Sequence, residues 1–120
     1  MYRYLNVNPK GEIKGDCVVR AISFALNIDY YDVVDMLIHN SNYFNCNLLV
    51  RDCYSKILTI DFNLPEYSGN GMSVKQLAYE FNDKILIIRT EGHLTCSKYG
   101  IIYDIWDCSD EIVDCFWVAN

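Results

Sequence analysis

The chain has 120 residues, of which 52% are hydrophobic, and a formal net charge of −6 at pH 7. This length predicts a single domain with its own hydrophobic core, covering residues 1–120. The negative charge argues against nucleic-acid binding through phosphate contacts, and no apolar run approaches membrane-spanning length. The start of the chain is too polar and too short for a signal peptide, so we expect a cytoplasmic protein.

The N-terminal half of the chain is predicted to be mostly helical. Residues 6–15 contain an Asn-Pro pair and two glycines, which is typical of a loop. Asp16 is a potential cap for a helix that runs to about residue 27, where apolar side chains recur at helical spacing. A second helix is predicted over residues 29–39, and a third over residues 48–58 after a polar break.

The pattern changes to strands in the C-terminal half. Residues 61–71 are rich in Pro and Gly and predict an irregular segment, and a capping box at residues 73–76 then opens a short helix. The predicted strands cover residues 85–89, 93–97, 101–106 and 115–118. The first of them is apolar throughout and is expected to be buried on both faces. Helices followed by antiparallel strands predict an α+β fold, with the N-terminal helices packed on a small antiparallel sheet.

The six cysteines do not have the spacing of a metal site. The chain has no Cys-x-x-Cys motif and no paired Cys/His cluster, so we expect no metal and no cofactor. In the cytoplasm the thiols should be mostly reduced. Cys46 and Cys53 are expected on one buried stripe of a helix. Structural core positions are predicted for Cys46, Cys53, Cys96, Cys108 and Cys115.

Cys17 has the clearest chemical signature, because it lies where the loop turns into the first helix. A thiol in the first turn of a helix is favoured as the thiolate by the helix dipole. Downstream, His93 opens a predicted strand, and Asp104 and Asp107 lie on the next one. This order suits a nucleophile that attacks a carbonyl, a base that takes and returns its proton, and a carboxylate that orients the base.

Each of these residues also has an ordinary structural interpretation. Cys17 lies on the apolar stripe of its helix and could be a core cysteine. His93 could be a hydrogen-bonded strand residue, and the two aspartates could face solvent. The catalytic prediction therefore depends on the combination and its order. Arg20, one helical turn after Cys17, could lie near the site, but we expect a structural ion pair with a loop carboxylate.

The choice between the two aspartates depends on the register of the predicted hairpin. A two-residue turn after Lys98 pairs it with Ile101, which puts Asp104 on the same face as His93 and diagonally beside it. A slip of one residue would put Asp107 on that face instead. We favour Asp104 as the orienting group and keep Asp107 as the alternate.

Four segments of the chain resemble one known family. They are NP at residues 8–9, GDCVVRA at 15–21, GHLT at 92–95 and GIIYDIWD at 100–107. They are similar to segments of the small, mostly uncharacterised papain-like proteins of phages and Gram-positive bacteria. The resemblance implies a papain-like domain with Cys17 as nucleophile, His93 as base and Asp104 or Asp107 as orienting group.

The chain departs from this family at the oxyanion donor. Papain-like peptidases usually carry a Gln shortly before the Cys, and Gly11 stands there in this sequence. The Cys17 backbone N–H can supply one donor, and Asn8, or alternatively Asn6, is the candidate for the other.

Two functions are therefore in competition. The first is a thiol hydrolase, most simply a cysteine peptidase that cleaves a peptide or isopeptide bond in a protein or peptide substrate. The alternative is a catalytically weak or inactive binding protein on the same scaffold, for example a phage-encoded inhibitor of a host protein. The Cys/His/Asp order favours the enzyme, whereas small size, acidity and the missing Gln favour the alternative.

Overall fold

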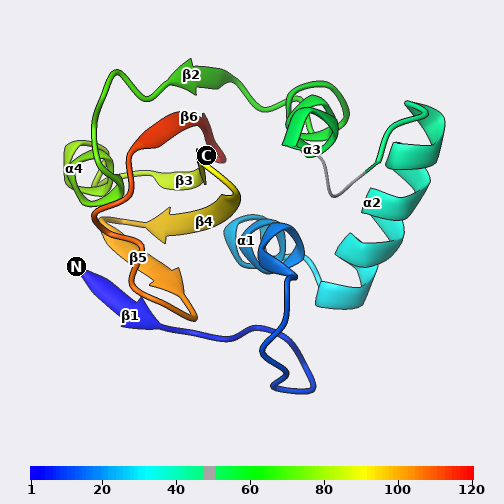
Figure 1. The fold of residues 1–120 in the computed structure, drawn as a ribbon, viewed down its shortest axis with the longest axis horizontal. Helices are drawn as coiled ribbons and strands as arrows, with labels where there is room; N and C mark the ends of the chain where they lie inside the picture. Colours follow the sequence, from blue (N-terminus) through cyan, green and yellow to red (C-terminus); the bar gives the residue numbers. More distant parts are fainter. Residues whose placement is uncertain (48–50) are drawn as a thin grey trace.

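The computed structural model describes residues 1–47 and 51–120, and this part of the chain forms an α+β fold (Figure 1). The helices are α1 (Cys17–Leu26), α2 (Tyr30–Tyr43), α3 (Arg51–Lys56), which continues into the π-helical turn η1 (Ile57–Asp61), and α4 (Val74–Glu80). The strands are β1 (Tyr2–Tyr4), β2 (Glu66–Ser68), β3 (Ile85–Thr90), β4 (His93–Lys98), β5 (Ile101–Asp104) and β6 (Val113–Val118). No helix among the described residues is long and apolar enough to cross a membrane.

The described strands form one six-stranded sheet in the order β1-β5-β4-β3-β6-β2. Adjacent strands in this sheet are antiparallel except for β1 and β5, which are parallel. The α+β class is as predicted, but the sheet is mixed, whereas the sequence predicted a small antiparallel one. The two edge strands, β1 and β2, were not predicted, because three largely exposed residues carry too little alternation of apolar and polar side chains to indicate a strand.

The sheet separates two hydrophobic cores (Figure 1). Helix α1 lies against one face, with α2 and α3 beyond it, and α4 covers the other face. Strand β3 serves both cores, because alternate side chains point to opposite faces. Ile87 packs in the core of α1, and Leu86 and Ile88 pack in the core of α4. The prediction that this strand is buried on both faces is confirmed, since all three residues are fully buried.

The starts of the helices follow their predicted caps to different degrees. Asp29 caps α2 by accepting hydrogen bonds from two backbone N–H groups of its first turn. Ser73 and Gln76 form the predicted capping box of α4. Asp16 occupies the cap position of α1, but its side chain makes no capping hydrogen bond there. Its carboxylate is instead engaged in the network described below.

The prediction that Cys46 and Cys53 lie on one buried stripe of a helix is wrong. Cys46 lies beyond the end of α2 in an irregular segment, and it forms a disulfide with Cys53 in α3. Residues 48–50, which belong to the predicted third helix, lie outside the described residues. The two sulfurs therefore approach from different segments, Cys46 from the residues that follow α2 and Cys53 from α3. The free cysteines Cys96, Cys108 and Cys115 are buried, as predicted for structural positions.

Candidate functional site

Cys17 is the first residue of α1, as the sequence predicts. Its side chain is partly exposed, and it lies close enough to the His93 ring and the Leu94 backbone N–H for both to act on the pKa of its thiol. Burial raises the pKa of the thiol, but the contacts with His93 and Leu94 outweigh it, and the positive charge of Arg20 adds to them. The net effect is a thiol pKa below its ordinary value, which favours the thiolate.

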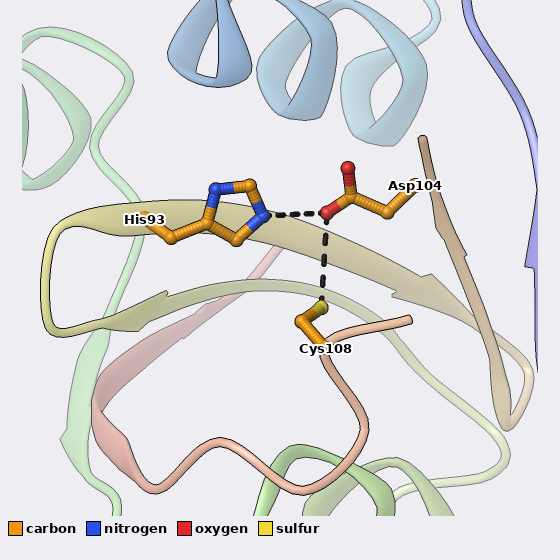
Figure 2. Close-up of side chains that lie close together, drawn as sticks. All are labelled: His93, Asp104 and Cys108. Carbon is orange, nitrogen blue, oxygen red and sulfur yellow. Dashed lines mark hydrogen bonds and ion pairs between the residues drawn. The ribbon is translucent and has the colours of Figure 1, made fainter. Parts of the chain in front are cut away.

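His93, the first residue of β4, contacts Asp104, the last residue of β5 (Figure 2). The distance from His93 Nε2 to Asp104 Oδ2 is 2.7 Å. Because Nε2 is taken by the carboxylate, Nδ1 is the ring nitrogen left for the Cys17 thiol. The Trp106 ring packs on the imidazole, with ring centroids 4.9 Å apart. Both members of the pair are buried, so the ring is held in one orientation.

The register of the hairpin explains why Asp104 takes this place. Lys98 pairs with Ile101, as predicted, and the ladder between β4 and β5 ends two pairs later. Asp104 follows directly and stands beside His93. Asp107 lies beyond the strand, is exposed, and accepts hydrogen bonds from the backbone and hydroxyl of Ser109. The structure therefore brings Asp104 to the histidine and leaves Asp107 in the following turn.

The Asp104 carboxylate accepts hydrogen bonds on both of its oxygens. Oδ1 accepts from Arg20 Nη1 at 3.1 Å and from the Ile105 backbone N–H at 2.7 Å. Oδ2 is shared by His93 and by the Cys108 thiol, whose sulfur is 3.7 Å away (Figure 2). Arg20 comes from the side of α1, whereas Cys108 belongs to the core of α4. The carboxylate is thus fixed from both faces of the sheet.

These contacts favour ionised forms of the buried pair. Burial raises the pKa of Asp104, but the hydrogen bond and positive charge of His93, together with the other hydrogen bonds to the carboxylate, lower it by more than burial raises it. The carboxyl group therefore remains ionised. Burial lowers the pKa of His93, yet the hydrogen bonds to Asp104, Cys108 and Cys17 raise it to about 11. A protonated imidazole next to Cys17 is the partner that a thiolate requires.

Asn8 takes a different place from the one proposed for an oxyanion donor. It is buried, and its Nδ2 lies 3.1 Å from Asp16 Oδ2 and 3.4 Å from Tyr30 Oη. The Asn8 amide nitrogen is therefore directed into the network around Asp16, where both of its contacts lie close together. The Asn6 amide donates to the Glu12 carbonyl. The remaining oxyanion donor is the Cys17 backbone N–H, which has no carbonyl partner within α1 because it starts the helix.

Two parts of this site were missed from the sequence. Cys108 was assigned to the core, and it does lie there, but its sulfur also touches the Asp104 carboxylate. Tyr30 opens α2 and donates its hydroxyl to Asp16 Oδ2 at 2.7 Å. The sequence offers a weak signal for Cys108, which follows Asp104 by four residues in a short turn. It offers none for Tyr30, because the contact joins two different helices.

His93, Asp104 and Cys108 form the group among the described residues that could ligate a metal, since their ligand atoms lie within 4.8 Å of one another. The distances between these ligand atoms fit a shared hydrogen bond better than a bound metal ion. Two atoms bound to a tetrahedral zinc ion at about 2.0 Å each are separated by about 3.3 Å. His93 Nε2 and Asp104 Oδ2 are 2.7 Å apart, which is a direct hydrogen bond. The Arg20 guanidinium on the same carboxylate also disfavours a cation there.

The chain was compared with protein-family models, with curated proteins and with solved structures, and none of them matches it. The functional argument therefore depends on the geometry of the site. That geometry combines a thiol with a lowered pKa, an imidazole with a raised pKa and a fixed, ionised carboxylate. Such a set can form a nucleophile and return a proton to a leaving group.

Proposed function

We propose that the protein is a papain-like thiol hydrolase that cleaves a peptide or isopeptide bond. The observation that carries this proposal is the 2.7 Å contact of His93 with Asp104, together with the neighbouring Cys17, whose thiol pKa His93 lowers. The nucleophile stands at the N-terminus of a helix, and the base and its orienting group stand on adjacent strands. The four sequence segments that resemble papain-like proteins contain these three residues, which supports the same reading.

The proposed reaction proceeds through an acyl-enzyme. The Cys17 thiolate attacks the substrate carbonyl carbon, and the Cys17 backbone N–H stabilises the resulting oxyanion. The His93 imidazolium gives its proton to the leaving amine as the C–N bond breaks, which leaves a thioester on Cys17. Neutral His93 then takes a proton from water, the hydroxide attacks the thioester, and the carboxylic acid leaves. Asp104 keeps the imidazole oriented and stabilises its charged form.

The first test is the pH dependence of Cys17 alkylation by iodoacetamide, followed by peptide mass spectrometry. Selective labelling alone is insufficient, because Cys17 is more exposed than the free cysteines Cys96, Cys108 and Cys115. The informative comparison is between the wild type and His93→Asn. At pH 6 the wild type should react about tenfold or more faster, since each pKa unit changes the thiolate fraction tenfold. Identical profiles would contradict the proposal.

One observation favours the binding protein as a second candidate function. The buried Asn8 amide nitrogen donates into the network of Asp16 and Tyr30, so this side chain is not a free oxyanion donor like the Gln that papain-like peptidases usually carry. An activated ester such as p-nitrophenyl acetate separates the two functions. Release of many equivalents of p-nitrophenol, lost in Cys17→Ala, supports the hydrolase. A single equivalent, with a stable acetyl group on Cys17, supports a reactive but non-hydrolytic binding protein.

A further inference from the structure

Arg20 lies between the two halves of the candidate site. Its Nε is 2.7 Å from Asp16 Oδ1, and its Nη1 is 3.1 Å from Asp104 Oδ1. Asp16 directly precedes the nucleophile, and Asp104 contacts the base. One buried guanidinium therefore joins the start of α1 to the end of β5, two segments far apart in the sequence. No step of the reaction proposed above involves Arg20 directly.

The Asp16 end of this link is fixed by its surroundings. Asp16 Oδ2 accepts a hydrogen bond from Tyr30 Oη at 2.7 Å and one from Asn8 Nδ2 at 3.1 Å. The Asp16 carbonyl also accepts the Arg20 backbone N–H at 3.0 Å. The loop before α1, the first turn of α1 and the start of α2 are thereby tied together. Arg20 is thus held at a fixed point beside Cys17.

At the other end, Arg20 sets the orientation of the Asp104 carboxylate. It binds Oδ1 from the side of α1, together with the Ile105 backbone N–H, which turns Oδ2 toward His93. A guanidinium is planar and presents its donors in a rigid fork. It can therefore bind two carboxylates at once with a set angle between them, which the single ammonium of a lysine cannot reproduce.

We propose that Arg20 is a positioning residue that fixes Cys17 relative to the His93–Asp104 pair. It does so by binding the carboxylate next to the nucleophile and the carboxylate next to the base. This inference rests on the proposed function, because the position of Cys17 against His93 matters only if that contact activates the thiol. Arg20 itself touches neither the sulfur nor the substrate in this role.

The test is the rate of Cys17 alkylation as a function of pH in Arg20→Met and Arg20→Lys. In Arg20→Met the Asp104 carboxylate loses the donor that fixes its orientation, and the start of α1 loses its link to the end of β5. A misplacement of about 1 Å can cost about 100-fold in rate, so we expect a loss of about 10- to 100-fold at pH 6. The inflection of the profile should move toward that of an ordinary thiol. Arg20→Lys keeps the positive charge but loses the forked donors of the guanidinium. Its alkylation rate should therefore fall between those of the wild type and Arg20→Met.

Leu77→Ala is the control for a variant that lowers the stability of the protein without moving Cys17 relative to His93. Leu77 is fully buried in the core of α4, on the opposite face of the sheet from α1. This variant should melt at a lower temperature and keep the wild-type pH profile. If Arg20→Met does not fold, Asp16→Asn takes its place, because it keeps the shape of the side chain and removes the charge that holds Arg20 Nε. It should shift the profile in the same direction by a smaller amount.

The outcomes separate this inference from the function on which it rests. If wild-type Cys17 has the same pH profile as the His93→Asn variant, the proposed function fails and the inference falls with it. If the wild type is activated by His93 and folded Arg20 or Asp16 variants match it in rate and in profile, the inference alone is overturned. If the wild type is activated and these variants shift while Leu77→Ala does not, the inference stands.

Discussion

Two regions of the molecule are built from different kinds of interaction: the hydrophobic core under α4, and the charged junction at which α1 meets β4 and β5, beside the second hydrophobic core. The core under α4 consists of apolar side chains, and members such as Leu77 and Leu86 are fully buried. At the junction of α1 with β4 and β5, the buried groups include Asp16, Arg20 and Asp104. The stability of an apolar core depends on filling its volume, and its side chains can repack after a change. The energy of a buried ion pair depends instead on the distance and orientation of each partner. The first region supplies stability, and the second fixes positions at a cost in desolvation.

The largest expected effect comes from Asp104→Ala. It leaves Arg20 without one of its two carboxylates and His93 without its orienting partner. Removing one member of a buried ion pair typically costs about 3–5 kcal/mol of unfolding free energy. Denaturant unfolding followed by circular dichroism should show this loss, and Cys17 alkylation in the folded fraction should fall. Asp107→Ala is the matched control, because Asp107 is exposed, and equal effects from the two would place the orienting group elsewhere.

Leu86→Ala should destabilise the protein without changing its chemistry. Leu86 is fully buried on the α4 side of β3, and truncation of a buried leucine costs about 2–5 kcal/mol. Denaturant unfolding measures this loss, and the Cys17 alkylation profile should remain that of the wild type. A changed profile would mean that the two sides of the sheet are coupled, and the comparison between them would then be too simple.

Acid should act on the charged junction before it acts on the apolar core. Asp16 and Asp104 have pKa values lowered from the ordinary 3.8 in the folded protein. Their contribution to stability is therefore present above about pH 4 and is lost as the pH falls through their folded pKa values. Unfolding free energies measured between pH 5 and pH 2 should decline less steeply in Asp104→Asn than in the wild type. Parallel curves would show that other carboxylates dominate the acid transition.

The smallest effect is expected at the capping box of α4. Ser73 accepts the Gln76 backbone N–H, and the Gln76 side chain accepts the Ser73 backbone N–H. Ser73→Ala should lower the unfolding free energy by about 1 kcal/mol, because one N–H group of the first helical turn loses its partner. Thermal melting can detect this, with Lys75→Ala in the same turn as the exposed control. A loss as large as that of Leu86→Ala would indicate a role beyond capping.

Local patterns predicted the elements that carry the site. The loop-to-helix change at Asp16 predicted the place of Cys17, and the two-residue turn after Lys98 predicted the register that brings Asp104 beside His93. Both features depend on residues close together in the sequence, where turn geometry and helical periodicity determine the outcome.

Contacts between distant segments were not predictable in this way. The parallel pairing of β1 with β5 depends on backbone hydrogen bonds at an edge, which leave no side-chain pattern. Arg20 binds two carboxylates, Asp16 just before α1 and Asp104 at the end of β5. The sequence predicted one ion pair with a loop carboxylate, but it did not indicate the second partner on a distant strand. The disulfide between Cys46 and Cys53 was missed because a helical stripe and a closed loop can share the same sequence separation.

The pairing of β1 with β5 has a consequence for synthesis on the ribosome. The Leu5 backbone N–H donates to the Asp104 carbonyl, and the Ile102 backbone N–H donates to the Met1 carbonyl, so residues 1–5 are bound to a segment about 100 residues further along the chain. Chains elongate at about 5–20 residues per second, and contacts between distant segments form late in folding. Cys17 therefore leaves the exit tunnel seconds before His93 and Asp104. A nascent chain that has not yet exposed His93 and Asp104 therefore carries an unactivated thiol, and the activated site arises only after residue 104 has emerged.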